Sequence, residues 1–407
     1  MSVKRVAILG TLDTKGEEVR FLQQRIADLG LGTLVIDVGV LEPPASAPDI
    51  SRADVAQAGG TSLEELLTRR DRGESMQAMA RGSAVIARQL YEQGAIQGLI
   101  SLGGSAGTSI GTSAMRALPV GFPKLMVSTL ASGDTRPYVG TKDIAMLYSV
   151  VDISGINVLS RRILGNAAAA IAGMVQQEAA DVSTERPLIG ATMFGVTTPC
   201  VTEARKLLEA EGYEVLVFHA TGTGGQAMEG LIADGFISGV LDITTTELAD
   251  ELVGGVLSAG PNRLEASGAK AIPQVVCPGA IDMVNFGPME TVPEKFKARK
   301  LYKHNPSVTL MRTTSDECRE LGRVTAEKLN RSRGPAVLAI PLQGVSAIDI
   351  EGGPFYWPEA NQAYLDAVKA HLDPQMRLVE VDAHINDKHF AETVARVLLE
   401  MLKSPRS

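Results

Sequence analysis

The chain has 407 residues, 45% of them hydrophobic and 21% charged, which excludes a disordered protein and predicts at least two domains. Its formal net charge of −8, without a long run of Lys or Arg, argues against a nucleic-acid-binding protein. Cys200, Cys277 and Cys318 are widely spaced and form no metal-binding or disulfide pattern, so we expect a reducing, cytoplasmic compartment.

The first half of the chain alternates apolar strands with helices. Residues 3–9 predict a strand that is buried on both faces, and Asp13 and Lys15 follow too soon for a signal peptide. No stretch reaches the roughly 20 apolar residues of a membrane helix, so we expect no membrane association. Further strands are expected at 33–38, 96–102, 124–129 and 144–151, and helices at 17–29, 74–93 and 157–180.

The polar segment 181–187 ends in proline and predicts the boundary between two domains, residues 1–182 and 183–407. Strands of the second domain are expected at 188–193, 214–218, 239–242, 274–277, 308–311, 336–340 and 377–381. This alternation predicts an α/β fold with two Rossmann-like domains, mostly parallel sheets and glycine-rich loops at the strand ends. Ligands of such sheets bind at the carboxyl ends of the strands.

A polar loop, residues 10–18 (GTLDTKGEE), follows the first predicted strand. Thr11 and Thr14 can donate hydroxyl hydrogen bonds, and Lys15 can meet a phosphate charge. Asp13 can hold Mg²⁺ or orient a sugar hydroxyl. The alternative is a helix cap formed by Asp13 or Thr14, with Glu17 completing a capping box, and the two interpretations are compatible.

Two more loops of this kind follow the next strands. Residues 103–109 (GGSAGTS) can form a nest of backbone N–H groups for an anion, or can simply allow close packing of a helix on the sheet. Residues 128–134 (STLASGD) add small polar groups and a second candidate for Mg²⁺. The predicted nucleotide site consists of Thr11, Asp13, Thr14, Lys15, Gly103, Gly104, Ser105, Gly107, Thr108, Ser132 and Gly133, with Asp13 and Asp134 as metal ligands.

The second domain carries a further set of strand-end loops, of which residues 219–229 (HATGTGGQAME) are the richest in glycine. We expect Thr221, Gly222, Gly224 and Gly225 to contact an anionic substrate. His219 lies at a strand end, where a general base would be well placed, although a lone histidine is more often structural.

Candidate catalytic and substrate-binding residues also follow the later strands. Asp242 and Asn285 are expected to bind substrate, although a threonine cap with Glu247 in the first helical turn is the alternative for residues 242–247. The expected catalytic residues are His219, Asp282, His304 and Arg312. Arg312 can pair with a carboxylate or phosphate, and a salt bridge between the domains is its alternative role. The aromatic loop 344–359 is either a lid or an oligomer contact.

The motifs GTLDTKGEE, GGSAGTS, FHATGTGGQAMEGL, CPGAIDMVNFG, HNPSVTLMRTT and PLQGVSAIDIEGGPFYWPEAN resemble those of an uncharacterised bacterial and fungal family. Plant members of that family carry this region as the N-terminal part of a tomato mosaic virus resistance protein. The resemblance covers essentially the whole chain. It implies an ATP-binding N-terminal domain, a homo-oligomer such as a dimer, and a TIM-barrel domain that here could be a separate partner.

Three functions remain open at this point. The chain could be an ATP-dependent enzyme that transfers a phosphoryl or acyl-phosphate group to a small organic or sugar acid in an inter-domain cleft, with Mg²⁺. It could instead be a non-catalytic ATP-binding regulatory module for a protein partner, such as a TIM-barrel enzyme. The third possibility is an ATP-independent lyase or hydrolase that uses the His219 loop.

Overall fold

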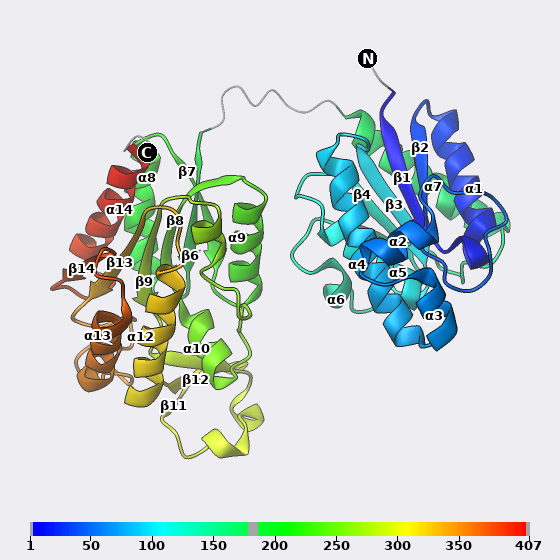
Figure 1. Ribbon diagram of the computed structural model, residues 1–407. Coiled ribbons are helices and arrows are strands. Elements are labelled where there is room, and N and C mark those ends of the chain that lie inside the picture. Colours follow the sequence, from blue (N-terminus) through cyan, green and yellow to red (C-terminus); the bar gives the residue numbers. More distant parts are fainter. Residues whose placement is uncertain (1–2, 178–185, 404–407) are drawn as a thin grey trace. The chain divides into compact units, whose positions relative to one another are not determined.

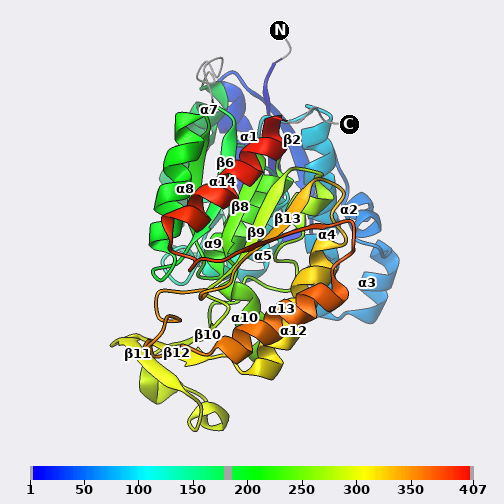
Figure 2. The ribbon, with the colours of Figure 1, turned by 90° about the vertical axis from the view of Figure 1, so that its left-hand side faces the viewer.

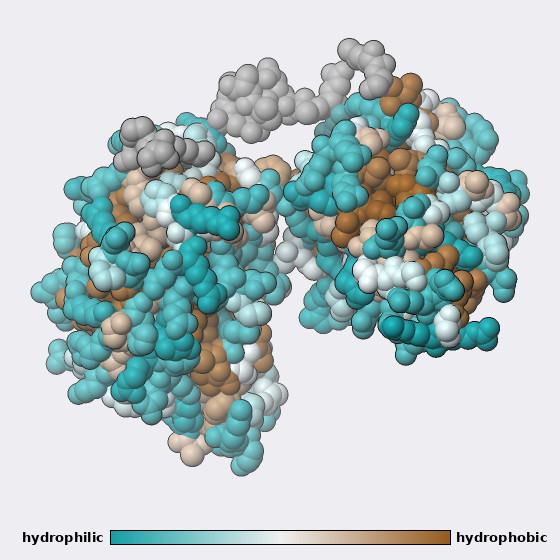
Figure 3. Space-filling view, viewed as in Figure 1, coloured by the Kyte–Doolittle hydropathy of each residue, from teal (hydrophilic) through white to brown (hydrophobic). Residues whose placement is uncertain are grey.

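The computed structural model describes residues 3–177 and 186–403, and the chain divides into two compact units, Met1–Val182 and Ser183–Ser407 (Figure 1). Of the predicted boundary segment 181–187, residues 181–185 lie outside the described part of the chain. The predicted α/β fold with mostly parallel sheets is confirmed. Figure 3 shows hydrophilic residues over most of the visible face of each unit, as expected where the apolar side chains are packed in cores.

The N-terminal unit has one parallel sheet with the strand order β2-β1-β3-β4-β5. Its strands are β1 (Arg5–Gly10), β2 (Gly32–Asp37), β3 (Gly98–Gly103), β4 (Lys124–Ser128) and β5 (Ala145–Tyr148). Its helices are α1 (Leu12–Asp28), α2 (Arg52–Ala58), α3 (Leu63–Arg69), α4 (Arg72–Glu92), α5 (Ser105–Arg116), α6 (Arg136–Val139) and α7 (Val158–Gln176). This is the flavodoxin-like order, in which the direction of winding reverses between β1 and β3 and ligands bind beside that reversal.

Alternate residues of β1 pack on opposite faces of this sheet. Val6 and Ile8 contact the core beneath α1 and α7, whereas Ala7 and Leu9 contact the core beneath α2, α4 and α5. Helix α7 is long and apolar enough to cross a membrane by length and composition alone. Its buried residues, such as Ile171, belong to the core of the unit.

The C-terminal unit repeats this plan with one more strand, in the order β14-β13-β9-β8-β6-β7. Its parallel strands are β6 (Leu188–Met193), β7 (Glu214–His219), β8 (Ile237–Thr244), β9 (Gln274–Gly279), β13 (Ala336–Pro341) and β14 (Arg377–Val381). Its helices are α8 (Thr198–Ala210), α9 (Thr223–Ala233), α10 (Thr246–Val253), α11 (Ala266–Ala269), α12 (Ser315–Leu329), α13 (Pro358–His371) and α14 (Lys388–Lys403). The direction of winding reverses between β6 and β8.

A small antiparallel sheet, in the order β10-β12-β11, follows β9 and departs from the predicted parallel pattern. Its strands are β10 (Met283–Phe286), β11 (Leu301–Asn305) and β12 (Val308–Arg312), and two 3₁₀ turns lie at Met289–Thr291 and Glu294–Phe296. The predicted strand 308–311 is therefore confirmed as a strand, but it pairs outside the parallel sheet.

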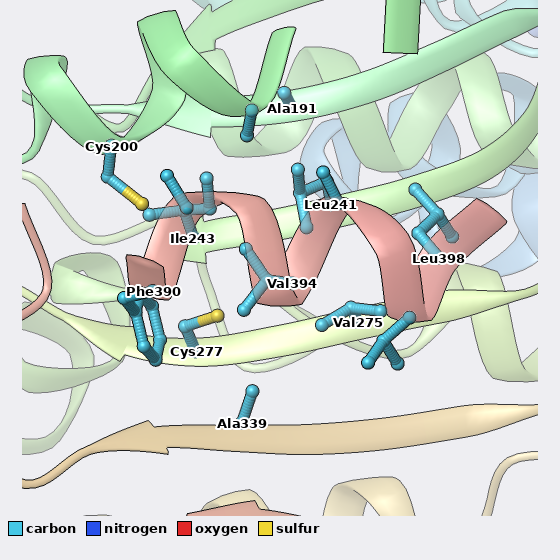
Figure 4. Close-up of a cluster of buried hydrophobic side chains, with 14 of the residues drawn as sticks. Ala191, Cys200, Leu241, Ile243, Val275, Cys277, Ala339, Phe390, Val394 and Leu398 are labelled. Atoms are coloured by element: carbon cyan, nitrogen blue, oxygen red, sulfur yellow. The ribbon is translucent and has the colours of Figure 1, made fainter. Parts of the chain in front are cut away.

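Helices α8 and α14 cover one face of the six-stranded sheet (Figure 2). Figure 4 shows Phe390 and Val394 of α14 among the side chains of the strands, beside Val275 and Cys277 of β9. Helices α10, α12 and α13 lie over a second cluster that contains Val276 and Leu338. Burial of each large side chain of this kind contributes about 1.5–3 kcal/mol, so each unit has a substantial core of its own.

Candidate functional site

An uncapped helix N-terminus with open space beside it lies where β3 passes into α5. Gly104 is the N-cap of α5, and its backbone is extended (φ −79°, ψ −153°) with no side-chain cap. The first hydrogen bond of the helix runs from the Thr108 N–H to the Gly104 carbonyl (2.8 Å). The N–H groups of Ser105, Ala106 and Gly107 precede it in the first turn, where an anion can accept them.

The glycines of this loop serve two purposes. A Cβ atom at Gly103 would lie 2.8 Å from the Cα of Gly107, and one at Gly107 would lie 3.1 Å from the Leu102 carbonyl oxygen. These two glycines therefore bring α5 close to β3. The nearest atom to a Cβ at Gly104 would be the Thr129 hydroxyl oxygen at 3.8 Å, so the space beside Gly104 is open.

Other predicted nucleotide contacts in this region have partners within the unit. The Thr108 hydroxyl forms a buried hydrogen bond with the Ser128 hydroxyl (2.7 Å), which joins α5 to β4 rather than reaching a ligand. Gly133 donates its N–H to the Leu130 carbonyl (3.0 Å) in the loop that also carries Ser132. Asp134 is exposed, and the hydrogen bonds from Arg136 lower its pKa to about 2.

The first helix, α1, has its N-terminus capped by the protein itself. Asp37, the last residue of β2, accepts the N–H groups of Leu12 (3.1 Å) and Gly39 (2.9 Å). Burial raises the pKa of Asp37, and the neighbouring Asp13 carboxylate adds to the rise. A carboxylate at the N-terminus of α1 takes the place that we predicted for a phosphate. Asp37 was missed, although an acid that ends an apolar strand was its signal.

Asp13 and Lys15, two of the side chains predicted as ligand contacts in the first loop, have partners within the protein, whereas Thr11 and Thr14 bond to each other at the surface. Asp13 accepts the Leu41 N–H (2.9 Å) and packs against Gly39, and its other carboxylate oxygen is buried. Lys15 interrupts the helical backbone and donates its ammonium to the Ile153 carbonyl. The hydroxyl oxygens of Thr11 and Thr14 lie 2.9 Å apart in an exposed pair.

The two predicted metal ligands differ in their environment, and one oxygen of Asp13 is buried without a hydrogen-bond partner in the described part of the chain. Both oxygens of Asp134 accept from Arg136 (2.8 Å each), and Asp13 is enclosed by the loop after β2. Within residues 3–177 and 186–403, no group of three or more His, Cys, Asp or Glu side chains could hold a metal ion. Asp13 and Asp134 are therefore not part of a three-residue metal site among the described residues.

In the C-terminal unit, the glycine-rich loop is filled by one of the protein's own carboxylates. Glu247 accepts the N–H groups of Gly222 (2.7 Å) and Gly225 (3.1 Å). A Cβ atom at Gly225 would lie 2.1 Å from a Glu247 oxygen, which explains the glycine at this position. Two of the backbone donors that we predicted for an anionic substrate, those of Gly222 and Gly225, are therefore engaged inside the unit.

Arg263 completes this buried network. Its guanidinium donates to both oxygens of Asp242 (2.5 and 2.7 Å), to Glu247 (2.7 Å) and to Glu229 (3.2 Å). Asp242 also accepts the Thr192 hydroxyl (2.6 Å), so the residue predicted to bind substrate joins β8 to β6. Arg263 was missed because it lies in an irregular segment without any local pattern.

The predicted histidines lie apart from this network. His219 is exposed at the end of β7, and its ring lies edge-on to Phe194 with the ring centroids 5.4 Å apart. Its carbonyl oxygen would lie 1.9 Å from a Cβ at Gly224, which identifies Gly224 as a packing position, and it accepts the Thr221 hydroxyl (3.2 Å). His304 is exposed on β11.

Arg312 and Asp282 do come together, but in a buried cluster. Arg312 donates to the Phe355 carbonyl (2.8 Å), the Thr313 hydroxyl (2.8 Å) and the Asn361 side-chain oxygen (3.0 Å). Its three nitrogens are thus engaged within the unit, which argues against its predicted roles as a substrate ligand and as an inter-domain salt bridge. Asp349 lies 3.8 Å from the same guanidinium.

Asp282 and Asn285 have structural partners. The Ser346 hydroxyl donates to Asp282 (2.8 Å), and burial, together with repulsion from Asp349, raises the pKa of Asp282 to about 7 against the opposing effect of Arg312. Asn285 donates through its backbone (2.9 Å) and side chain (2.6 Å) to Asp250, whose pKa burial raises to about 7.

The aromatic loop 344–359 is attached along its length. Asp349 accepts the Val345 N–H (3.0 Å) and the Asn361 amide (2.7 Å). His384, which was not predicted, contacts the Ser346 carbonyl through Nε2 (2.9 Å) and accepts the Asn386 N–H at Nδ1 (3.1 Å). These contacts hold the loop against the rest of the unit, which argues against its interpretation as a mobile lid.

We expect the Asp282→Asn substitution to flatten the pH dependence of stability. Because the folded-state pKa is about 7 and the ordinary value 3.8, the folded chain keeps a proton between about pH 4 and 7 that the unfolded chain has lost. This group therefore makes the free energy of unfolding fall as pH rises, by at most about 1.4 kcal/mol per pH unit. Urea unfolding of the wild type and the variant at pH 5 and pH 7.5 tests this. An equal change in the free energy of unfolding between the two pH values for both proteins would contradict the prediction.

The fold and these contacts define a class of protein, two flavodoxin-like α/β units of which the first has an open helix N-terminus beside its β1–β3 reversal. The chain belongs to the Uncharacterised protein family (UPF0261), whose N-terminal domain matches residues 4–180 and whose C-terminal domain matches residues 186–402. The resemblance stated from the motifs is confirmed at this level.

Two relatives illustrate the range of the family. A UPF0261 protein of Clostridium tetani is 59% identical over 401 residues, which cover 98% of this chain and 99% of that protein. The ToMV resistance protein Tm-1(GCR237) of Solanum lycopersicum is 41% identical over 425 residues, which cover 99% of this chain and 56% of that protein. Among solved structures, UDP-N-acetylglucosamine 2-epimerase from Rickettsia bellii matches at 8% identity with a TM-score of 0.22, over 98% of this chain and 96% of that chain.

Proposed function

We propose that the N-terminal unit binds a nucleotide, ATP, with its phosphates at the N-terminus of α5. The observation that carries this proposal is the uncapped first turn of α5 beside the open space at Gly104. This turn lies at the β1–β3 reversal, where sheets of this order bind ligands. The contrast with α1 supports the choice of helix, because Asp37 already places a carboxylate at the α1 N-terminus.

We favour a non-catalytic, ATP-binding regulatory module over an enzyme that phosphorylates a small acid. The groups proposed to hold the acid, Arg312, Gly222 and Gly225, have partners inside the C-terminal unit. The name of the tomato relative, a virus resistance protein, is compatible with action through a protein partner. A separate TIM-barrel protein remains the partner that the sequence resemblance suggests.

Titration calorimetry with three ligands tests the proposal. Mg·ATP and Mg·tripolyphosphate should both release heat on binding, whereas adenosine should bind far more weakly, because the α5 turn recognises phosphate. Steady-state assays with ATP should detect no turnover above background for the isolated protein. Binding of adenosine without tripolyphosphate would place the site elsewhere, and no binding of any of the three ligands would overturn the proposal.

Lys15→Ala should weaken ATP binding by less than about tenfold, a loss of less than about 1.4 kcal/mol. The reason is that the Lys15 ammonium already donates to the Ile153 carbonyl and so gains little from a phosphate. The same calorimetric titration measures the change. A loss as large as that caused by substitutions in the α5 turn would move the phosphates towards α1.

A further inference from the structure

A pocket of about 150 Å³ lies at the carboxyl edge of the six-stranded sheet in the C-terminal unit. Pro278 at the end of β9 and Pro341 at the end of β13 form one side of it, and the first turns of α13, with Asn361, form the other. The larger depression of about 420 Å³ in this unit lies instead at the amino ends of β13 and β14, near Ala336 and Arg377. Only the smaller pocket lies where parallel sheets bind ligands.

The residues that line this smaller pocket, all within the described range 186–403, include no Lys, Arg, His, Asp or Glu. They are Pro278, Ile281, Ile340, Pro341, Leu342, Gln343, Gly344, Val345, Tyr356, Pro358, Asn361, Gln362, Tyr364 and Leu365. A carboxylate or phosphate in this pocket would lose its hydration without gaining a charged partner, which is costly. The pocket therefore selects an uncharged ligand, unlike the small acid that the sequence suggested.

Three amide side chains give the pocket a polar edge. Asn361 accepts a hydrogen bond from Arg312 (3.0 Å) and donates one to Asp349 (2.7 Å), and these two buried partners fix the orientation of its amide. An amide has two donor hydrogens and two acceptor positions, so Asn361 keeps one of each for a ligand. Gln343 and Gln362 use their amide nitrogens on Asp382 and Asp366, which leaves their oxygens as acceptors.

The size and the side chains of the pocket suit a small ring with a polar edge. A cavity of about 150 Å³ is large enough to hold a molecule of the size of benzene, and this one combines proline and leucine side chains with amides. Two exposed apolar side chains, Leu342 (43%) and Tyr356 (42%), lie at its rim, where a bound ring would remove their surface from water.

We propose that this pocket binds a small, uncharged, planar ring compound that carries an amide-like hydrogen-bonding edge. The ring occupies the space between the proline walls and Leu365, and its polar edge meets the free donor and acceptor of Asn361. The ligand is thus distinct in chemistry and in place from the nucleotide of the N-terminal unit. A substitution that removes binding at one site should therefore leave binding at the other site measurable.

The single tryptophan of the chain provides the measurement. Trp357 lies between the pocket residues Tyr356 and Pro358, and its ring lies 5.8 Å from the Arg312 guanidinium carbon. The full-length protein is titrated with benzamide and with benzoate, which have similar size and differ in charge. Tryptophan fluorescence and ligand-observed NMR saturation transfer are recorded together, so that a spectroscopically silent binding event is still detected.

Benzamide should bind at least about tenfold more tightly than benzoate, because the pocket offers no charged partner to a carboxylate. Leu342→Lys should weaken benzamide binding at least fivefold and improve benzoate binding. The matched control Val256→Lys changes an exposed apolar residue outside the pocket of the same unit (64% exposed) and should alter neither affinity. Equal binding of benzamide and benzoate, no binding of benzamide by either method at millimolar concentration, or an unchanged benzamide affinity in Leu342→Lys would overturn the proposal.

Discussion

Gly104→Asp should weaken ATP binding at least about 100-fold. The N-terminal unit should stay as stable as before or become slightly more stable. The new carboxylate would accept N–H groups in the first turn of α5, much as Asp37 accepts the Leu12 N–H at the start of α1. It would therefore occupy the donors that we assign to the phosphates and repel the phosphate charge. The extended backbone of Gly104 and the open space beside it accommodate the side chain without strain.

The opposite signs of the two effects make this substitution informative. Aspartate is preferred over glycine as an N-cap by a few tenths of a kcal/mol, so the thermal midpoint should hold or rise. Calorimetric titration with Mg·ATP and thermal unfolding of the same samples measure the two effects. Gly104→Asn is the matched control, because it caps the helix with similar shape but without charge and should weaken binding less. Undiminished ATP binding by Gly104→Asp would show that α5 does not hold the phosphates.

The sequence predicted most strands of the two parallel sheets well, for a physical reason. Apolar runs such as 188–193 and 336–340 are buried on both faces in a parallel sheet, so their ends coincide with β6 and β13 to within one residue. Glycine and hydroxyl residues then follow where each strand turns into a helix. The short antiparallel strands β10 (MVNF) and β11 (LYKHN) were missed because runs of four and five residues carry little periodic signal, and β10 lies inside a segment that was predicted to be a loop.

Which loop stays open for a ligand could not be predicted from local sequence. GTLDTKGEE and GGSAGTS are both rich in potential donors, but Asp37 arrives at the first from β2, 25 residues beyond Leu12. In the same way, Glu247 reaches Gly222 from the N-terminal turn of α10. An anion nest that is filled by a distant carboxylate looks the same in sequence as one that awaits a ligand.

Arg263→Met should destabilise the C-terminal unit by about 3–5 kcal/mol at neutral pH, the usual cost of leaving buried charges without a partner. Arg263 is fully buried and is the cation that faces Asp242, Glu247 and Glu229 within hydrogen-bonding distance. Urea unfolding, followed by far-ultraviolet circular dichroism, measures the loss. Arg205→Met is the control, because Arg205 pairs with Glu209 on the surface and should cost at most about 1 kcal/mol.

The destabilisation by Arg263→Met should shrink when the pH is lowered from 8 to 5. Burial already raises the pKa of Glu247, and the arginine opposes that rise. Without the arginine, the folded-state pKa of Glu247 should rise further above its unfolded value. The variant then takes up a proton on folding, so its stability falls as pH rises through the interval between the unfolded and folded pKa values of Glu247. A destabilisation that is equal at both pH values would mean that lost packing, rather than unpaired charge, accounts for the effect.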